Sequence, residues 1–189
     1  QETPSLPYLT VATYESLIAY LKKMSPVLSL DRWISGGRVS AGIILTFDDG
    51  WKDSYTLAYP VLKKHSLPAT IFLTVNYIGT DKQSWQVRLY KLLPKLPSEK
   101  MGSIGDGVLK SRLKIYSESN NKFEAYLQLT KYLKTKPTLY IENLFAQWGE
   151  PAHSTSGPVC LSWDQVKEMQ SCGIDFGSHT LNHVILTVE

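Results

Sequence analysis

Two short apolar runs separated by a helix-forming segment constrain the fold of this chain most. Ala41–Phe47 (AGIILTF) and Ala69–Val75 (ATIFLTV) are apolar on both alternating faces, which is typical of strands in a parallel sheet that is covered on both sides. Between them, Ser54–His65 predicts a helix that ends before Leu67-Pro68. A strand, a helix and a second strand joined by short connections predict a βαβ unit, and therefore an α/β fold.

The segments before this unit predict one more helix and one more strand. Tyr14–Met24 has an amphipathic helical pattern, and Thr13 is the expected N-cap. Val27–Leu30 predicts a short strand, and Asp31 is expected to cap a brief helical turn through Trp33.

The C-terminal part of the chain predicts a further helix and strand. Ser162–Cys172 begins with a Ser that is a good N-cap, and Gly173 provides a stop. Ile174–Gly177 then predicts a third short parallel strand, which ends immediately before His179.

From residue 85 to about residue 149 the pattern is helical instead, with a polar break at Gly102–Gly107 and a loop at Pro151–Pro158. The helices expected there are Arg88–Leu93, Asn121–Leu133 and Thr138–Trp148. We therefore expect one domain over residues 1–189, with a helical insertion at about 85–157.

Four side chains that suit metal chemistry follow two of the predicted strands. Asp48 and Asp49 come directly after the first apolar run, and His179 and His183 follow the third strand. Active sites of α/β barrels and open sheets are built at this end of the strands. Because the two aspartates are neighbours, their side chains diverge, which suits one carboxylate for binding a metal and the other for acting as a base.

Each motif alone has a plainer explanation. Asp-Asp-Gly is a common turn, although two charges buried behind an apolar strand need a partner such as a metal. The histidines, four residues apart, can direct two ring nitrogens to one point if the segment turns helically. A zinc protease is excluded, because its HExxH motif needs a Glu where this chain has Thr180. If the imidazoles bind a metal, the base must come from another residue, and Asp48 or Asp49 can supply it.

The composition indicates a globular protein of 189 residues, with 43% hydrophobic residues and 20% charged residues. No stretch reaches the ~18 apolar residues of a membrane span. A glycine loop for phosphates and a nucleophile elbow are both missing from the sequence, and we expect no nucleic-acid partner. The chain begins with Gln in place of Met, which leaves open whether a targeting segment has been removed.

The two cysteines, Cys160 and Cys172, could form a disulfide, but free, partly buried thiols are the favoured interpretation.

The charge distribution and the tryptophan residues give weaker indications of function. The net charge is +3, but residues 82–136 hold twelve Lys/Arg and four Asp/Glu. This segment could meet an anionic glycan or lipid, although solvated helix faces are the favoured interpretation. Four tryptophans could line a sugar platform, although aromatic residues more often belong to a core. They are Trp51, Trp85, Trp148 and Trp163.

Taken together, the motifs resemble those of the polysaccharide deacetylases with a NodB homology domain (carbohydrate esterase family 4). The resemblance rests on LTFDDG at 45–50, PATIFL at 68–73 and GSHTLNH at 177–183, and it extends over most of the chain. It implies a distorted (β/α) barrel that hydrolyses acetyl groups of glycans with a divalent metal, N-acetyl being favoured over O-acetyl.

Matched by position, the resemblance makes Asp48 the general base and makes Asp49, His179 and His183 the metal ligands. Zinc is favoured for such a set, with cobalt, manganese or nickel as alternatives. Two histidines and one carboxylate leave open positions for water and substrate, and a bound metal lowers the pKa of water from 15.7 toward ~7–9. The expected partner is an acetylated glycan, and the family resemblance points to the cell envelope or a secreted protein.

The family's later motifs, which supply a base-orienting Arg and a His general acid, have no counterpart in these 189 residues, and Val184 stands where a Pro is usual. We therefore expect an incomplete barrel, little activity from this chain by itself, and an open sheet edge that favours self-association. Two alternatives remain from the sequence. One is a non-catalytic carbohydrate-binding or surface module that keeps the metal, and the other is a metal-dependent amidohydrolase acting on a small non-sugar amide.

Overall fold

The computed structural model describes residues 9–36, 41–150 and 158–188, and divides the chain into two compact units. One unit is α/β and is built from residues 9–82 and 155–183, while the other is helical and is built mainly from residues 83–154. None of the described helices is long and apolar enough to cross a membrane. The prediction of a single domain with an insertion at about 85–157 stays a prediction.

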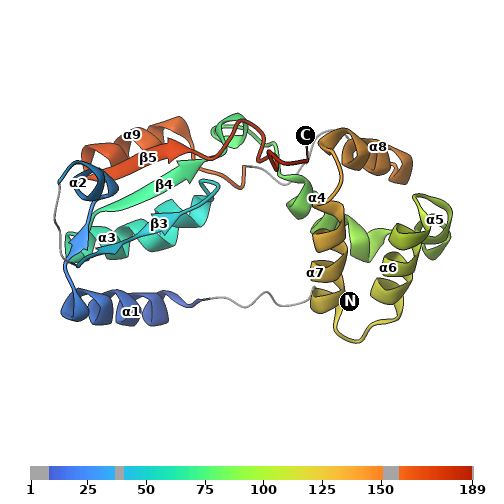
Figure 1. The fold of residues 1–189 in the computed structure, drawn as a ribbon, viewed down its shortest axis with the longest axis horizontal. Helices are drawn as coiled ribbons and strands as arrows, with labels where there is room; N and C mark the ends of the chain where they lie inside the picture. Colours follow the sequence, from blue (N-terminus) through green and yellow to red (C-terminus); the bar gives the residue numbers. More distant parts are fainter. Residues whose placement is uncertain (1–8, 37–40, 151–157, 189) are drawn as a thin grey trace. The chain divides into compact units, whose positions relative to one another are not determined.

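The α/β unit contains parallel strands whose order follows the chain (Figure 1). β1 pairs with β2, and β3, β4 and β5 form a second, three-stranded sheet in that order. The strands are β1 (Val27–Leu28), β2 (Ile43–Ile44), β3 (Thr46–Phe47), β4 (Ala69–Leu73) and β5 (Ile174–Ser178). The predicted α/β class with parallel strands is confirmed, and the barrel stays a prediction.

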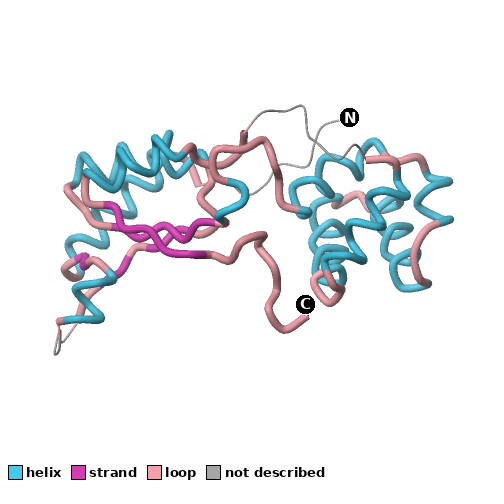
Figure 2. Tube along the Cα trace, turned by 90° about the horizontal axis from the view of Figure 1, so that it is seen from above, coloured by secondary structure: helices cyan, strands magenta, loops and turns pink. Residues whose placement is uncertain are grey.

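Helices connect these strands. α1 (Val11–Met24) precedes β1, α2 (Leu30–Ser35) follows it, and a π-helical turn at Ser54–Ala58 continues into α3 (Tyr59–His65) between β3 and β4. α9 (Trp163–Ser171) precedes β5. α3 and α9 share one apolar core with β4 and β5, and Figure 2 shows helices running along one side of the strands. This is expected where successive parallel strands are joined by crossovers of the same hand.

The first apolar run does not form the single covered strand that its sequence predicts. It is divided at Leu45 into β2 and β3, because β2 pairs with β1 whereas β3 pairs with β4. Leu45 still accepts a backbone hydrogen bond of 3.0 Å from Thr70. Thr46 is exposed and its apolar neighbours are only half-buried, since β3 has one described partner strand. Central β4, by contrast, is almost wholly buried.

Helix caps show where local pattern and structure agree. Ser162 caps α9 as predicted and forms a reciprocal capping box with Gln165. α1 instead begins earlier than expected, with Thr10 as its cap in place of Thr13, and α2 is capped by Ser29 in place of Asp31. In both cases the expected cap lies within the first helical turn, and a hydroxyl residue immediately before the helix accepts the capping hydrogen bond instead.

The helical unit packs around a core of its own. Its elements are α4 (Trp85–Leu92), a 3₁₀ turn (Leu93–Lys95), α5 (Ser98–Ser103), α6 (Gly107–Glu118), α7 (Lys122–Leu133) and α8 (Thr138–Trp148). Two of these helices, α5 and α6, are not predicted from the sequence, which indicates only a polar, Gly-containing break at Gly102–Gly107. Most of the predicted loop, residues 151–157, lies outside the described residues.

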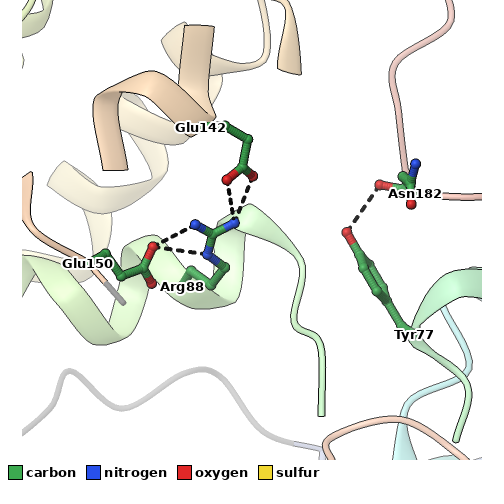
Figure 3. A network of polar contacts seen from close by, with 5 residues as sticks. All are labelled: Tyr77, Arg88, Glu142, Glu150 and Asn182. Carbon is green, nitrogen blue, oxygen red and sulfur yellow. Dashed lines mark hydrogen bonds and ion pairs between the residues drawn. The ribbon is translucent and has the colours of Figure 1, made fainter. Parts of the chain in front are cut away.

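Polar contacts hold this unit at its first and last helices. Arg88 of α4 binds Glu142 of α8 at 2.7 Å and Glu150 at 2.7 Å (Figure 3). Its guanidinium also lies over the Phe145 ring. An arginine fork shared by two carboxylates is geometrically specific, so it stabilises the pairing of α4 with α8.

Candidate metal centre

Three of the four predicted site residues converge in the α/β unit. One ligand atom from each of Asp49, His179 and His183 lies within 4.8 Å of the others. His179 Nε2 is 3.4 Å from Asp49 Oδ1, and His183 Nε2 is 3.1 Å from the same oxygen. The structure therefore brings together the three side chains that the sequence predicts as metal ligands, from segments 130 residues apart in the chain.

The turn that carries Asp49 depends on an unusual backbone. Asp49 has φ 69° and Gly50 has φ 75°, both in the left-handed region. Gly50 suits this left-handed backbone, and a Cβ there would also lie 2.7 Å from Leu73 Cδ2 and 2.9 Å from Ile78 Cδ1. The left-handed backbone turns the chain sharply at the end of β3 and places Asp49 beside the end of β4, where its carbonyl accepts from Thr74 N at 3.4 Å.

The histidine loop is not the helical turn that the i, i+4 spacing suggests. Thr180 (φ 66°) and His183 (φ 58°) both have left-handed backbones, and residues 179–185 do not form a helix. The two imidazoles therefore approach Asp49 without the helical turn that their spacing would allow. Long-range contacts, described next, shape the loop and let both imidazoles reach Asp49, with ring centroids 5.2 Å apart.

The turn after β4 holds the histidine loop in place. His179 N donates to Leu73 O at 2.8 Å, which continues the β4–β5 ladder as far as the first ligand. Beyond it, Val75 N donates to Thr180 O at 3.3 Å and Asn76 N to Leu181 O at 3.0 Å.

Side chains reinforce this attachment through Asn182. Asn76 Nδ2 donates to Asn182 Oδ1 at 2.7 Å, and the Tyr77 hydroxyl donates to the Asn182 carbonyl at 3.1 Å (Figure 3). Asn182 lies inside the HTLNH motif, but the sequence analysis gave none of these three residues a role. Their only signal was position, since Asn76 and Tyr77 directly follow the second apolar run.

The donor set fits a divalent cation. Asp49 Oδ1 is buried and accepts no hydrogen bond from any described residue, although two imidazole nitrogens surround it. A buried carboxylate oxygen without a donor is costly, and a cation would relieve that cost. The side chains of Asp49, His183 and His179 are 21%, 26% and 36% exposed, so the centre remains open to solvent on one side. Two imidazoles and a carboxylate form a set that zinc accepts.

Asp48 has a different environment from its neighbour. Its side chain is exposed, whereas that of Asp49 is largely buried, so the expectation of two buried charges holds for Asp49 only. The two carboxylates are thus separated by environment. The buried one meets the histidines and the exposed one is accessible to solvent.

Cys160 is a buried thiol near Asp49. Burial, with the charges of Asp49 and Asp53 adding to it, raises the pKa of the Cys160 thiol to about 11, so the thiol stays protonated at neutral pH. The other cysteine, Cys172, is exposed, and both are free thiols as the sequence analysis favoured.

The other histidine and the tryptophans that the structure describes lie in different environments. His65 ends α3 and lies 3.3 Å from Glu15 Oε1, consistent with a structural role. Trp85 and Trp148 belong to the core of the helical unit, and Trp163 is 46% exposed. Trp51 alone among the tryptophans hydrogen-bonds a predicted ligand, since its Nε1 donates to Asp49 Oδ2 at 3.0 Å.

Comparison with known proteins gives matches over part of the chain. The family model described as polysaccharide deacetylase matches residues 38–100, a stretch that includes Asp48 and Asp49 but neither histidine. A curated protein of Bacillus subtilis (strain 168), "Putative polysaccharide deacetylase YxkH", is 54% identical over 37 residues, which cover 20% of this chain and 13% of that protein. No solved structure matches the chain. The resemblance predicted from the sequence motifs is thereby confirmed.

Proposed function

We propose that this chain, which carries part of a polysaccharide deacetylase domain, acts in the metal-dependent removal of acetyl groups from a polysaccharide, with N-acetyl groups as the preferred target. The single observation that carries the proposal is the convergence of Asp49, His179 and His183 on one point. The family match includes the two aspartates but neither histidine, so the assignment of His179 and His183 rests on their sequence motif and on the fold.

The proposed roles follow from the environment of each side chain. Asp49 Oδ1, His179 Nε2 and His183 Nε2 would hold the cation, since these three atoms face one another. When bound, a divalent cation supplies Lewis acidity, which acidifies water and polarises an acyl oxygen. The open side of the centre would admit the acetyl group, because each of the three side chains retains solvent exposure.

Asp48 would act as the general base. Its exposed carboxylate can accept the proton from water as the water oxygen attacks the acetyl carbonyl carbon. Breaking the carbon–nitrogen bond then yields acetate and a free amino group on the sugar, with one proton passed to the departing nitrogen. Two adjacent aspartates can divide these tasks because only one of them faces the histidines.

Acetate release tests the proposal directly. In the presence of zinc we expect little acetate from N-acetylglucosamine oligomers with the 189-residue chain by itself, and clear release with a longer protein that contains it. A longer protein that binds zinc at these residues yet releases no acetate from any acetylated glycan would contradict a deacetylase. Release from a small non-sugar amide in preference to glycans would favour an amidohydrolase instead.

A further inference from the structure

The proposed function leaves one contact of the centre without a role, the hydrogen bond from the Trp51 indole to Asp49. Trp51 Nε1 donates to Asp49 Oδ2 at 3.0 Å, and this contact is partly buried. The other oxygen of the same carboxylate, Oδ1, is the one that faces His179 and His183. The two oxygens of one carboxylate therefore have separate partners.

The backbone around Trp51 holds the indole in this position. Trp51 forms an isolated antiparallel bridge with Cys160. On either side of it, Leu161 N donates to Gly50 O at 2.9 Å and Lys52 N donates to Val159 O at 2.9 Å. Trp51 is thus attached on both sides to the segment before α9, and its ring packs against the core of the α/β unit.

The left-handed turn explains how residue 51 reaches residue 49. Asp49 and Gly50 have consecutive positive φ values, which reverse the chain between the carboxylate and the indole. A tryptophan two residues after the ligand can therefore direct its N–H back to that ligand. An extended backbone would instead carry the side chains of residues 49 and 51 along parallel directions, out of donor–acceptor alignment.

We propose that Trp51 is a positioning residue for the metal ligand Asp49. Its indole N–H engages Oδ2 and fixes the carboxylate rotamer, so that Oδ1 alone is presented to the cation between the two imidazoles. This role rests on the proposed metal-dependent function. Metal-binding side chains are commonly oriented by such outer hydrogen bonds, and loss of one typically weakens metal affinity roughly 10–100-fold.

Zinc affinity of the 189-residue chain, measured by calorimetry, tests the role without any assay of activity. Trp51→Phe keeps an aromatic ring but removes the N–H, and we expect it to weaken zinc binding about 10–100-fold. Trp33→Phe is the matched control, because Trp33 is 57% exposed on α2, at the opposite end of the strands from the centre (Figure 1). It should bind zinc as the wild type does.

A second measurement separates positioning from packing. In the wild-type protein the indole hydrogen of Trp51, assigned by NMR, should exchange with solvent much more slowly than that of Trp33, and its signal should shift when zinc is added. This measurement remains decisive if Trp51→Phe does not fold. A purely structural role would lower the melting temperature of the metal-free variant and leave the zinc affinity unchanged.

The outcomes distinguish this inference from the proposed function. Equal zinc affinity in Trp51→Phe and wild type, or an indole hydrogen of Trp51 that exchanges as fast as that of Trp33, would overturn the positioning role while the metal centre stands. Wild-type protein that binds no zinc would overturn the metal-dependent function, and the positioning role with it.

Discussion

Asn76 Nδ2 donates a hydrogen bond of 2.7 Å to Oδ1 of Asn182, joining the turn after β4 to the loop that carries both histidines. The backbone of Asn76 binds the same loop at Leu181. One residue thus supports the histidine loop twice, once through its main chain and once through its side chain, although neither contact touches a predicted ligand atom.

Removal of the Asn76 side chain should weaken metal binding modestly. Asn76→Ala removes the side-chain bond but leaves the backbone bond, so a net loss of about 0.5–1.5 kcal/mol, or roughly 2- to 12-fold in zinc affinity, is expected. Calorimetry with zinc measures it. Asn120→Ala, an exposed position in the helical unit, is the control. Zinc affinity that does not change in Asn76→Ala would show that the backbone contacts suffice.

Removal of either imidazole should have a larger effect than removal of any supporting contact. In His179→Ala or His183→Ala the cation loses a direct ligand, so zinc affinity should fall by more than the roughly 10–100-fold typical of a lost outer partner. His65→Ala serves as the control, since His65 pairs with Glu15 instead. If the double variant His179→Ala/His183→Ala binds zinc as tightly as wild type, the centre lies elsewhere.

Asp48→Asn should separate binding from chemistry. The amide cannot accept a proton, so acetate release by a longer, active protein containing this chain should fall roughly 10²–10⁴-fold. Zinc affinity should stay at the wild-type value, because Asp48 is exposed and Asp49 faces the histidines. Loss of zinc in this variant would mean that the roles of the two aspartates are exchanged.

Gly50→Ala should destabilise the α/β unit more than Gly173→Ala. Both glycines have left-handed backbones, with φ of 75° and 87°, which cost an L-residue about 1–2 kcal/mol. A Cβ at Gly173 meets nothing within 4 Å, whereas one at Gly50 would press on Leu73 and Ile78, adding about 1–3 kcal/mol. Urea unfolding of the two variants gives the difference. Equal free energies of unfolding would mean that Leu73 and Ile78 move to accommodate the added methyl group without a loss of stability.

Asp106 should stabilise the helical unit at neutral pH, and this contribution should be lost in acid. A hydrogen bond from the Tyr132 hydroxyl, aided by the Leu109 N–H and by Lys136, lowers the pKa of Asp106 from 3.8 to about 2. A carboxylate whose pKa is lowered by folding adds stability above its unfolded-state pKa and loses it as pH falls toward the folded one.

Asp106→Asn keeps a good N-cap for α6 but removes the charge. Its free energy of unfolding should lie below that of wild type at pH 7, by under about 1 kcal/mol because the group is exposed. The gap should close as pH falls from about 4 to 2. A gap that is constant with pH would assign the effect to the cap alone.

Local pattern predicted much of this fold because several of its determinants are local. The capping box of α9 needs only Ser162 and Gln165, three residues apart. β4 was predicted because a central parallel strand must be apolar on both faces. The segments that carry the candidate ligands both follow predicted strands, and parallel strands bring such ends to one edge of a sheet. That rule predicts that Asp49 lies near the histidines.

Only the tertiary structure decided how these side chains meet. The spacing of His179 and His183 suggested a helical turn, yet hydrogen bonds from Val75 and Asn76 hold the loop with left-handed Thr180 and His183 instead. Trp51 gave no sign in the sequence that its indole would bind Asp49, since that contact depends on two left-handed residues between strand and bridge. Periodicity and capping residues indicate only the local conformational preference of a segment. The left-handed backbones of Thr180 and His183 are unfavourable locally, and contacts with a segment distant in the chain hold the loop that contains them, so their sequence does not reveal them.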